Sequence, residues 1–160
     1  MRRLTRESRA TLVGRLYDEH GPSLYRYALI LVAEHGAAED VLHQVFATLM
    51  RHKTELENAE HYLRRAVRNE CYSMLRRRVS HPVVSAPLLE SSQPEPVSAD
   101  DRIALETAIV ALPPDQREVV HLHVFEGMTF QEVAVATGES INTVSSRYRY
   151  ALEKLRATLA

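Results

Sequence analysis

The sequence predicts an all-α protein made of two small helical domains joined by a flexible linker. Glycine is scarce, with 5 residues in a chain of 160, and the frequent residues Leu, Ala, Arg and Glu favour helices. Residues 79–100 stand apart, because four of the seven prolines and five serines fall within them. Neither a helix nor a packed strand tolerates that density of proline. We therefore expect domains at residues 1–78 and 101–160, with residues 79–100 as the linker.

The first domain shows helical periodicity in two runs, followed by a third helix over about residues 59–78. Gly21-Pro22 and Gly36 are typical of turns, so we expect them to interrupt the helices. Apolar residues at three- and four-residue spacing include Leu24, Tyr27, Ala28, Leu31, Val41, Val45 and Leu49.

The second domain is also predicted to be helical. Its first helix covers about residues 101–112 and stops at Pro113. The next begins with Pro114 in its first turn, where the missing N–H costs nothing, and ends near Gly127. Residues 129–132 read as a capping box, with Thr at the N-cap and Glu three residues later. That short helix ends at Gly138, and Ser140 caps a final helix that reaches about residue 157.

The span from Thr129 to Leu155 has the spacing of a DNA-binding helix-turn-helix. On the last helix, Val144, Ala151 and Leu155 share the arc that should face the core. The opposite face is short and polar, with donors suited to base edges and phosphates. The alternative is an ordinary solvated face. The side chains on this face are Asn142, Thr143, Ser146, Arg147, Arg149 and Tyr150.

The third helix of the first domain carries a basic face, although the formal net charge of the chain is only −1. Arginine contacts phosphates and stacks on bases, and tyrosine offers a platform for an unstacked base. The mixture favours single-stranded or melting DNA, and the alternative is a surface that merely keeps the protein soluble. The residues of this face are His61, Tyr62, Arg64, Arg65, Arg68, Asn69, Tyr72 and Arg76.

Other function classes find little support in the sequence. The apolar block at residues 28–33 is far shorter than the ~20 residues of a membrane span, so we expect no membrane insertion. One cysteine, Cys71, fits a reducing cytoplasm. His121 and His123 would point to different sides of a helix, and Glu39 with His43 lacks a third ligand. We therefore expect no metal, no cofactor and no enzymatic activity.

Together these motifs resemble the bacterial sigma-70 family of RNA polymerase sigma factors, specifically the extracytoplasmic-function (ECF) group, which keeps only regions 2 and 4. The resemblance covers nearly the whole chain and follows the family's order. The segments that carry it are LYDEH (16–20), LYRYA (24–28), AEDVLHQVF (38–46), YLRRAVRN (62–69), LRRR (75–78), ALPPDQREV (111–119), FEGMT (125–129) and TVSSR (143–147).

The resemblance implies that the chain binds core RNA polymerase and directs promoter recognition, DNA melting and transcription initiation. Region 2 would capture a flipped base of the minus-ten element, while region 4 would read the minus-thirty-five element, with Ser145 among its contacts, and touch the β flap. The implied partners are core polymerase, promoter DNA and an anti-sigma factor. Residues implied to grip the clamp of the β′ subunit are Glu39, Asp40, Leu42, His43, Gln44 and Phe46.

The chain departs from the family pattern at several positions. Ser73 stands where Asp is usual, and Tyr62 where Trp is usual. In the recognition helix, Ser145 and Tyr150 stand where basic residues are frequent. These departures weaken the expected phosphate contacts and leave the promoter sequence open. The alternative function is a stand-alone helix-turn-helix regulator, which would bind its operator without polymerase.

Overall fold

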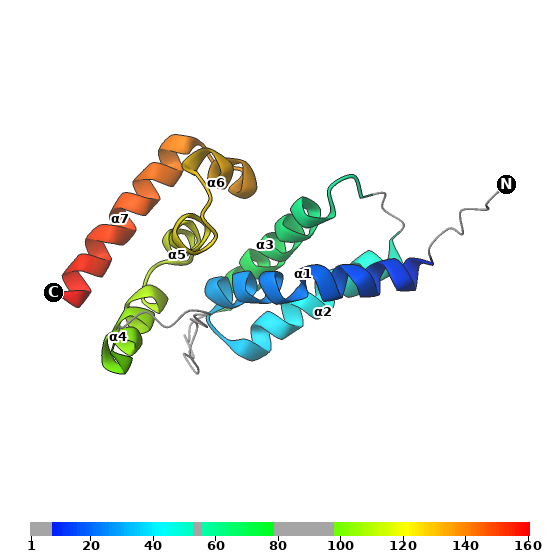
Figure 1. The fold of residues 1–160 in the computed structure, drawn as a ribbon, viewed down its shortest axis with the longest axis horizontal. Helices are drawn as coiled ribbons and strands as arrows, with labels where there is room; N and C mark the ends of the chain where they lie inside the picture. The colour runs from blue at the N-terminus through cyan, green and yellow to red at the C-terminus, as the bar shows by residue number, and fades with distance from the viewer. Residues whose placement is uncertain (1–7, 53–55, 79–97) are drawn as a thin grey trace.

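The computed structural model describes residues 8–52, 56–78 and 98–160, and within these residues every regular element is a helix. The predicted all-α class is confirmed. Figure 1 shows α1 to α3 gathered on one side and α4 to α7 on the other. The elements are α1 (Arg9–Val32), α2 (His35–Arg51), α3 (Ala59–Arg77), α4 (Ala99–Val110), α5 (Pro114–Val120), the π-helix η1 (His121–Phe125), α6 (Phe130–Thr137) and α7 (Ile141–Leu159).

Helix α1 runs unbroken through Gly21 and Pro22, so the predicted interruption there is wrong. A proline inside a helix costs roughly 3 kcal/mol through a lost hydrogen bond and a steric clash. Buried residues lie on both sides of it, including Val13, Leu16 and Leu24. Each fully buried aliphatic side chain contributes about 1.5–3 kcal/mol. Packing of the whole helix therefore outweighs the cost of one proline.

The sequence predicted the break between α1 and α2 at Gly36, but the structure has it at Ala33. Ala33 adopts the left-handed conformation, with φ of 57°, and its N–H donates to the Leu29 carbonyl. The Glu34 carboxylate then accepts from the Ala37 N–H at 3.2 Å and caps α2. Gly36 falls within the first turn of α2, because this side-chain cap sets the start of the helix upstream of the glycine.

Helix α4 begins after Ser98, whose hydroxyl caps the helix by accepting from the Asp101 N–H. Of the residues expected in the linker, Ala99 and Asp100 thus belong to α4 and Ser98 is its N-cap; residues 79–97 lie outside the described residues. The capping box of Thr129 is present as predicted. Gly138 ends α6 with φ of 71°, and Ser140 caps α7. The π-helical turn after α5, where the Glu126 N–H donates to the His121 carbonyl, was not predicted.

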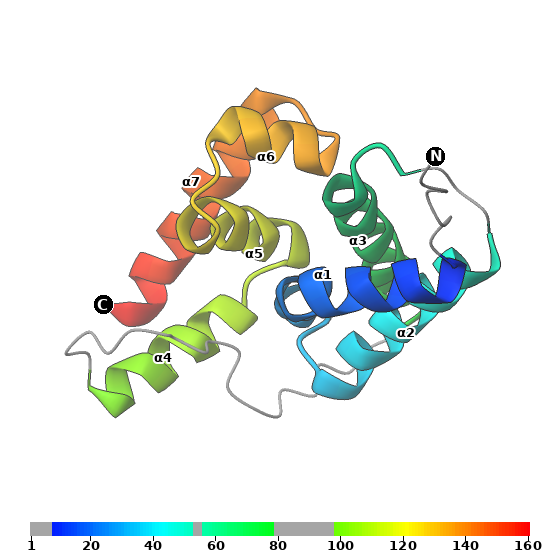
Figure 2. The same ribbon diagram turned by 45° about the vertical axis from the view of Figure 1, so that its right-hand side comes forward.

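The two domains pack against each other through α5 and α6. Figure 2 shows α5 between α7 and the first domain. Arg117 is buried on α5 and donates one hydrogen bond to the Leu31 carbonyl at 2.9 Å and another to the Val110 carbonyl at 2.8 Å. It thereby satisfies carbonyls near the ends of α1 and α4, where a cation is favoured. No described helix is long and apolar enough to cross a membrane.

Candidate nucleic-acid interface

Helices α6 and α7 form the predicted helix-turn-helix, and its core face is confirmed. Val144 and Ala151 are fully buried and Leu155 nearly so. The turn between the helices is fixed by Gly138, because its positive φ is strained for any residue with a side chain. The first-turn hydrogen bond from the Thr143 N–H to the Ser140 hydroxyl, at 3.1 Å, then sets the start of α7.

The opposite face of α7 presents most of its predicted DNA contacts to solvent. Asn142, Ser145, Arg149 and Tyr150 are exposed, whereas Thr143 and Ser146 are half-buried. The Arg149 guanidinium lies 5.0 Å from the centre of the Tyr150 ring, a cation–π arrangement that orders both side chains. The outer face of α7 is therefore polar and largely exposed over its first three turns.

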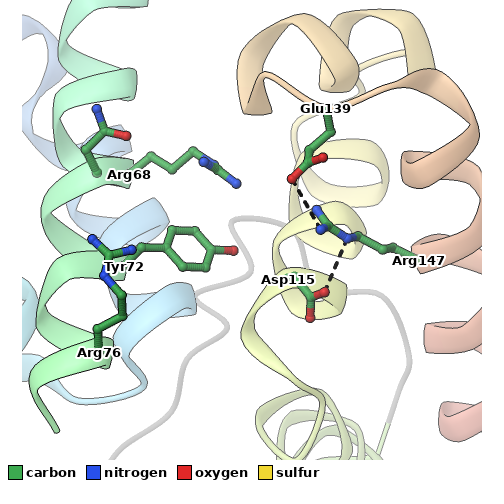
Figure 3. Close-up of a pocket in the computed structure, with 7 residues that line it drawn as sticks. Arg68, Tyr72, Arg76, Asp115, Glu139 and Arg147 are labelled. Atoms are coloured by element: carbon green, nitrogen blue, oxygen red, sulfur yellow. Dashed lines mark ion pairs between the residues drawn. The ribbon is translucent and has the colours of Figure 1, made fainter.

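Arg147, also predicted to contact DNA, is engaged within its own domain. Its guanidinium lies 3.2 Å from the Asp115 carboxylate and 3.2 Å from that of Glu139, so two anions face one cation (Figure 3). Arg147 is half-buried as a result. In this conformation it braces α7 against α5 and the α6–α7 turn instead of projecting toward a partner.

The basic face of α3 is divided between solvent and the second domain. Leu63, Val67 and Cys71 are fully buried on the apolar side. Glu70, which lies on the apolar arc by angle, pairs with Arg77 at 3.1 Å and remains partly exposed. Of the predicted DNA contacts, Arg64, Arg68 and Tyr72 are half-buried, and His61, Tyr62, Arg65, Asn69 and Arg76 are exposed.

Glu118 of α5 is the residue that holds the two domains together at this face. It has no exposed surface, yet lies between three side chains of the first domain. Its Oε1 accepts one hydrogen bond from Arg68 Nε, at 2.7 Å, and another from the Tyr27 hydroxyl. Its Oε2 accepts one from the Tyr72 hydroxyl, at 2.7 Å, and another from Arg68 Nη2, at 3.3 Å. Figure 3 shows Arg68 and Tyr72 extending from α3 toward the second domain. A buried charge is tolerated when it is paired and hydrogen-bonded in this way.

The surroundings of Glu118 shift the pKa values of its partners. Burial, together with the Glu118 carboxylate, raises the pKa of Tyr27 and that of Tyr72 well above the usual range. For Arg68, burial lowers the pKa, but the hydrogen bonds and charge of Glu118 outweigh it and raise the pKa overall. Both hydroxyls therefore remain protonated donors, and Arg68 remains a cation.

A cleft of about 310 Å³ lies next to this cluster, between α3 and the second domain. It is lined from α3 by Arg68, Asn69, Tyr72 and Arg76, and from the second domain by Asp115, Glu139 and Arg147 (Figure 3). Predicted DNA contacts of both domains thus face each other across one cleft. The described residues contain no cluster of three or more candidate metal ligands.

Helix α2 shows which of the predicted polymerase contacts reach the surface. Glu39, Asp40, His43 and Gln44 are exposed. Leu42 and Phe46 are 3% and 6% exposed and belong to the core, so they support the helix and present no contact surface here. Their spacing of four residues places both on one side of α2, and this side faces the bundle.

Sequence reasoning did not identify Glu118 as a functional residue. A signal was nevertheless present, since Arg117 and Glu118 are two adjacent charges directly before the apolar pair Val119 and Val120. Charged residues at buried positions of a helix need partners, and here the partners come from the other domain. Without the docking of the domains, those partners could not be named.

The fold and its two polar helix faces define a two-domain helical protein of the DNA-binding class. Residues 16–80 match the family model of Sigma-70 region 2, and residues 102–155 match that of Sigma-70 region 4. The ECF RNA polymerase sigma factor SigL of Mycobacterium tuberculosis is 31% identical, with 94% of this chain and 90% of that protein covered. The RNA polymerase sigma-E factor of Streptomyces coelicolor is 33% identical, over 86% of this chain and 80% of its own.

Solved structures agree. The sigma factor RpoE of Bartonella quintana, crystallised with the anti-sigma factor NepR, matches with a TM-score of 0.68 and 25% identity, over 91% of this chain and 95% of that one. CnrH, solved with the cytosolic domain of CnrY, has the same fold, with a TM-score of 0.63 over 92% of this chain and 86% of that one, at 22% identity. The chain belongs to the sigma-70 family and is an RNA polymerase sigma factor of the ECF group, as its sequence predicted.

Proposed function

We propose that this sigma factor binds core RNA polymerase through the exposed side of α2 and places two separate DNA-binding faces on a promoter. The basic face of α3 serves the minus-ten element and the outer face of α7 serves the minus-thirty-five element. One observation carries this proposal: the two polar faces lie on different domains, in the order of the two matched family regions. A chain of this kind can span a promoter when polymerase holds its domains apart.

The side chains of α3 suit a melted strand. Arg65 and Arg76 are exposed cations that can contact phosphates, and Tyr62 is an exposed ring on which a base can stack. Unstacking one base costs a few kcal/mol, which contacts of this kind offset. Melting then results from capture of the open form, and the chemistry of RNA synthesis belongs to the polymerase.

The outer face of α7 suits a duplex. Asn142 and Arg149 carry the amide and guanidinium groups that pair with adenine and guanine edges in the major groove. Both are exposed; Asn142 lies in the first turn of α7, where a recognition helix makes its base contacts, and Arg149 lies two turns further along. We assign these two residues to base reading, and Ser145, Ser146 and Thr143 to phosphate and base contacts beside them.

We further propose a cytoplasmic location and control by an anti-sigma factor. The Bartonella sigma factor and CnrH were each solved with a bound protein partner. A comparable partner of this chain would keep it from polymerase until a signal arrives. A pull-down from the native host, with the chain as bait, tests this against the outcome that polymerase alone is recovered.

The decisive experiment mixes the purified chain with bacterial core polymerase and fragmented genomic DNA of its host. We expect a stable complex that starts transcripts at a defined set of sites. An Asp40→Ala, His43→Ala variant should weaken the complex about tenfold or more, since truncating a hot-spot residue costs about 2 kcal/mol or more and about 1.4 kcal/mol is tenfold in Kd. Glu153→Ala, an exposed site on α7, is the control and should bind core polymerase normally. Sequence-specific DNA binding without polymerase, and no complex with it, would instead indicate a stand-alone regulator.

A further inference from the structure

The face of α3 assigned to the minus-ten element is the face on which the second domain docks. Arg64 Nη1 lies 3.8 Å from Met128 Sδ, and Arg68 and Tyr72 bind Glu118. A methyl group added at Gly138 would lie 3.3 Å from Arg65 Nη2. Side chains along three turns of α3 are therefore in contact with α5, α6 or the loop before α6.

We propose that Glu118 is an internal competitor of promoter DNA, which occupies Arg68 and Tyr72 in the free chain and keeps it from binding single-stranded DNA. This inference rests on the proposed function, because it takes Arg68 and Tyr72 as DNA contacts. It adds a regulatory role for a residue of the second domain. Opening of the two domains and exposure of the minus-ten face become one event.

The chemistry of the Glu118 site is that of a phosphate site. A carboxylate, like a phosphodiester, offers two oxygens and one negative charge, and it accepts charge-assisted hydrogen bonds from arginine. Arg68 binds Glu118 through two nitrogens, at 2.7 and 3.3 Å. Its guanidinium also lies over the Tyr72 ring at 4.6 Å, so both side chains are held in one arrangement. Neither can bind a DNA strand while Glu118 remains in place.

Tyr27 and Arg117 make further hydrogen bonds between the two domains beside Glu118. Tyr27 comes from α1, contacts Glu118 as a third partner and stacks on His121 with ring centres 6.1 Å apart. Arg117, adjacent to Glu118, binds the carbonyl of Leu31 near the end of α1. Neither residue is among the assigned DNA contacts. They offer a way to loosen the docked state without touching the DNA-binding face.

The competition has a quantitative consequence for the free chain. If only a fraction of the molecules is open, the apparent Kd for DNA rises by the inverse of that fraction, so about 1% open gives a roughly 100-fold weaker apparent affinity. A substitution that weakens docking raises the open fraction. It should therefore strengthen DNA binding by the free chain, which is the opposite of what loss of a binding residue does.

The test measures binding of the full chain, without polymerase, to a fluorescein-labelled oligothymidylate in about 50 mM salt, where phosphate contacts are strong. Glu118→Gln keeps the shape of the side chain but removes its charge. We expect its apparent Kd to be lower than that of the unaltered chain by about tenfold or more. Glu153→Gln changes the net charge equally at an exposed site on α7 and should leave the Kd within about twofold.

Two further variants separate the competition from other causes. Tyr27→Phe changes no charge and no DNA contact, and it should lower the apparent Kd by about threefold or more. If Glu118→Gln fails to fold, this variant alone tests the competition. Adding Arg68→Ala and Tyr72→Ala to Glu118→Gln should remove the gain, because Arg68 and Tyr72 are the groups released. An unchanged Kd in both single variants, or a gain that survives the loss of Arg68 and Tyr72 together, would overturn the proposal.

The proposed DNA contact is tested separately. In the holoenzyme on a promoter it opens, Arg68→Ala should weaken binding and reduce the salt slope by about 0.7 if the contact is to a single strand. An unchanged slope would remove Arg68 from the DNA contacts and refute that part of the proposed function. A reduced slope together with unchanged oligothymidylate binding by Glu118→Gln would refute only the internal competition.

Discussion

The Tyr27→Phe substitution measures how much one hydrogen bond across the domain interface contributes to stability. It deletes one hydroxyl, whose hydrogen bond to Glu118 crosses the domain interface, and it leaves a ring that is only 2% exposed. Hydrogen bonds to charged groups contribute roughly 1.5–3 kcal/mol. Glu118 retains Arg68 and Tyr72 as partners, so we expect a cost near the lower end, about 1.5–2 kcal/mol.

Urea denaturation followed by circular dichroism measures this cost. With a denaturant slope of about 2 kcal/mol/M, the midpoint should fall by about 0.8–1 M. Tyr25→Phe is the matched control on the same helix, because the Tyr25 hydroxyl lies 2.5 Å from His35 Nδ1 within the first domain. A typical hydrogen bond within a protein contributes about 0.5–1.5 kcal/mol. A midpoint change for Tyr27→Phe no larger than that of the control would refute the view that Glu118 depends on all three partners.

Three other predictions concern the fold around the site. Gly138→Ala and Gly127→Ala should each destabilise the protein by about 1 kcal/mol, because both glycines have positive φ. Only Gly138→Ala should also speed hydrogen exchange in α3, because its added methyl group would meet Arg65. Equal exchange in both variants would contradict this contact. Thr129→Ala should lower the free energy of unfolding, measured by calorimetry, by about 1 kcal/mol, because the capping box is lost. Thr158→Ala, at an exposed site on α7, is the control, and an equal loss of stability there would contradict the role of the capping box. Burial raises the pKa of Cys71 to about 12, so the thiol stays protonated at pH 8 and should react with a thiol reagent only as fast as the protein opens; fast labelling of the native chain would show that the thiol is accessible.

The sequence alone determines the all-α fold class, the presence of two helical domains and the assignment to the sigma-70 family. Periodic apolar residues and side-chain caps act over a few residues, so Thr129, Gly138 and Ser140 could be interpreted without tertiary contacts. The same local reasoning was wrong at Gly21-Pro22 and at Gly36. At Gly21-Pro22, burial of α1 on both sides of the proline keeps the helix continuous. At Gly36, the Glu34 side chain caps α2 ahead of the glycine, so the helix begins before it.

The candidate site, too, could be predicted from the sequence only in part. Helical angles placed Arg68 and Tyr72 on a polar face and Val67 and Cys71 in the core, as the structure has them. What covers the polar face could not be predicted, because Glu118 lies far along the chain, beyond a proline-rich segment that local rules cannot fold. A buried carboxylate needs donors from whatever surface it meets. The sequence thus determined which side chains form the polar face of α3, and only the packing of α5 on α1 and α3 decided that Arg68 and Tyr72 bind Glu118.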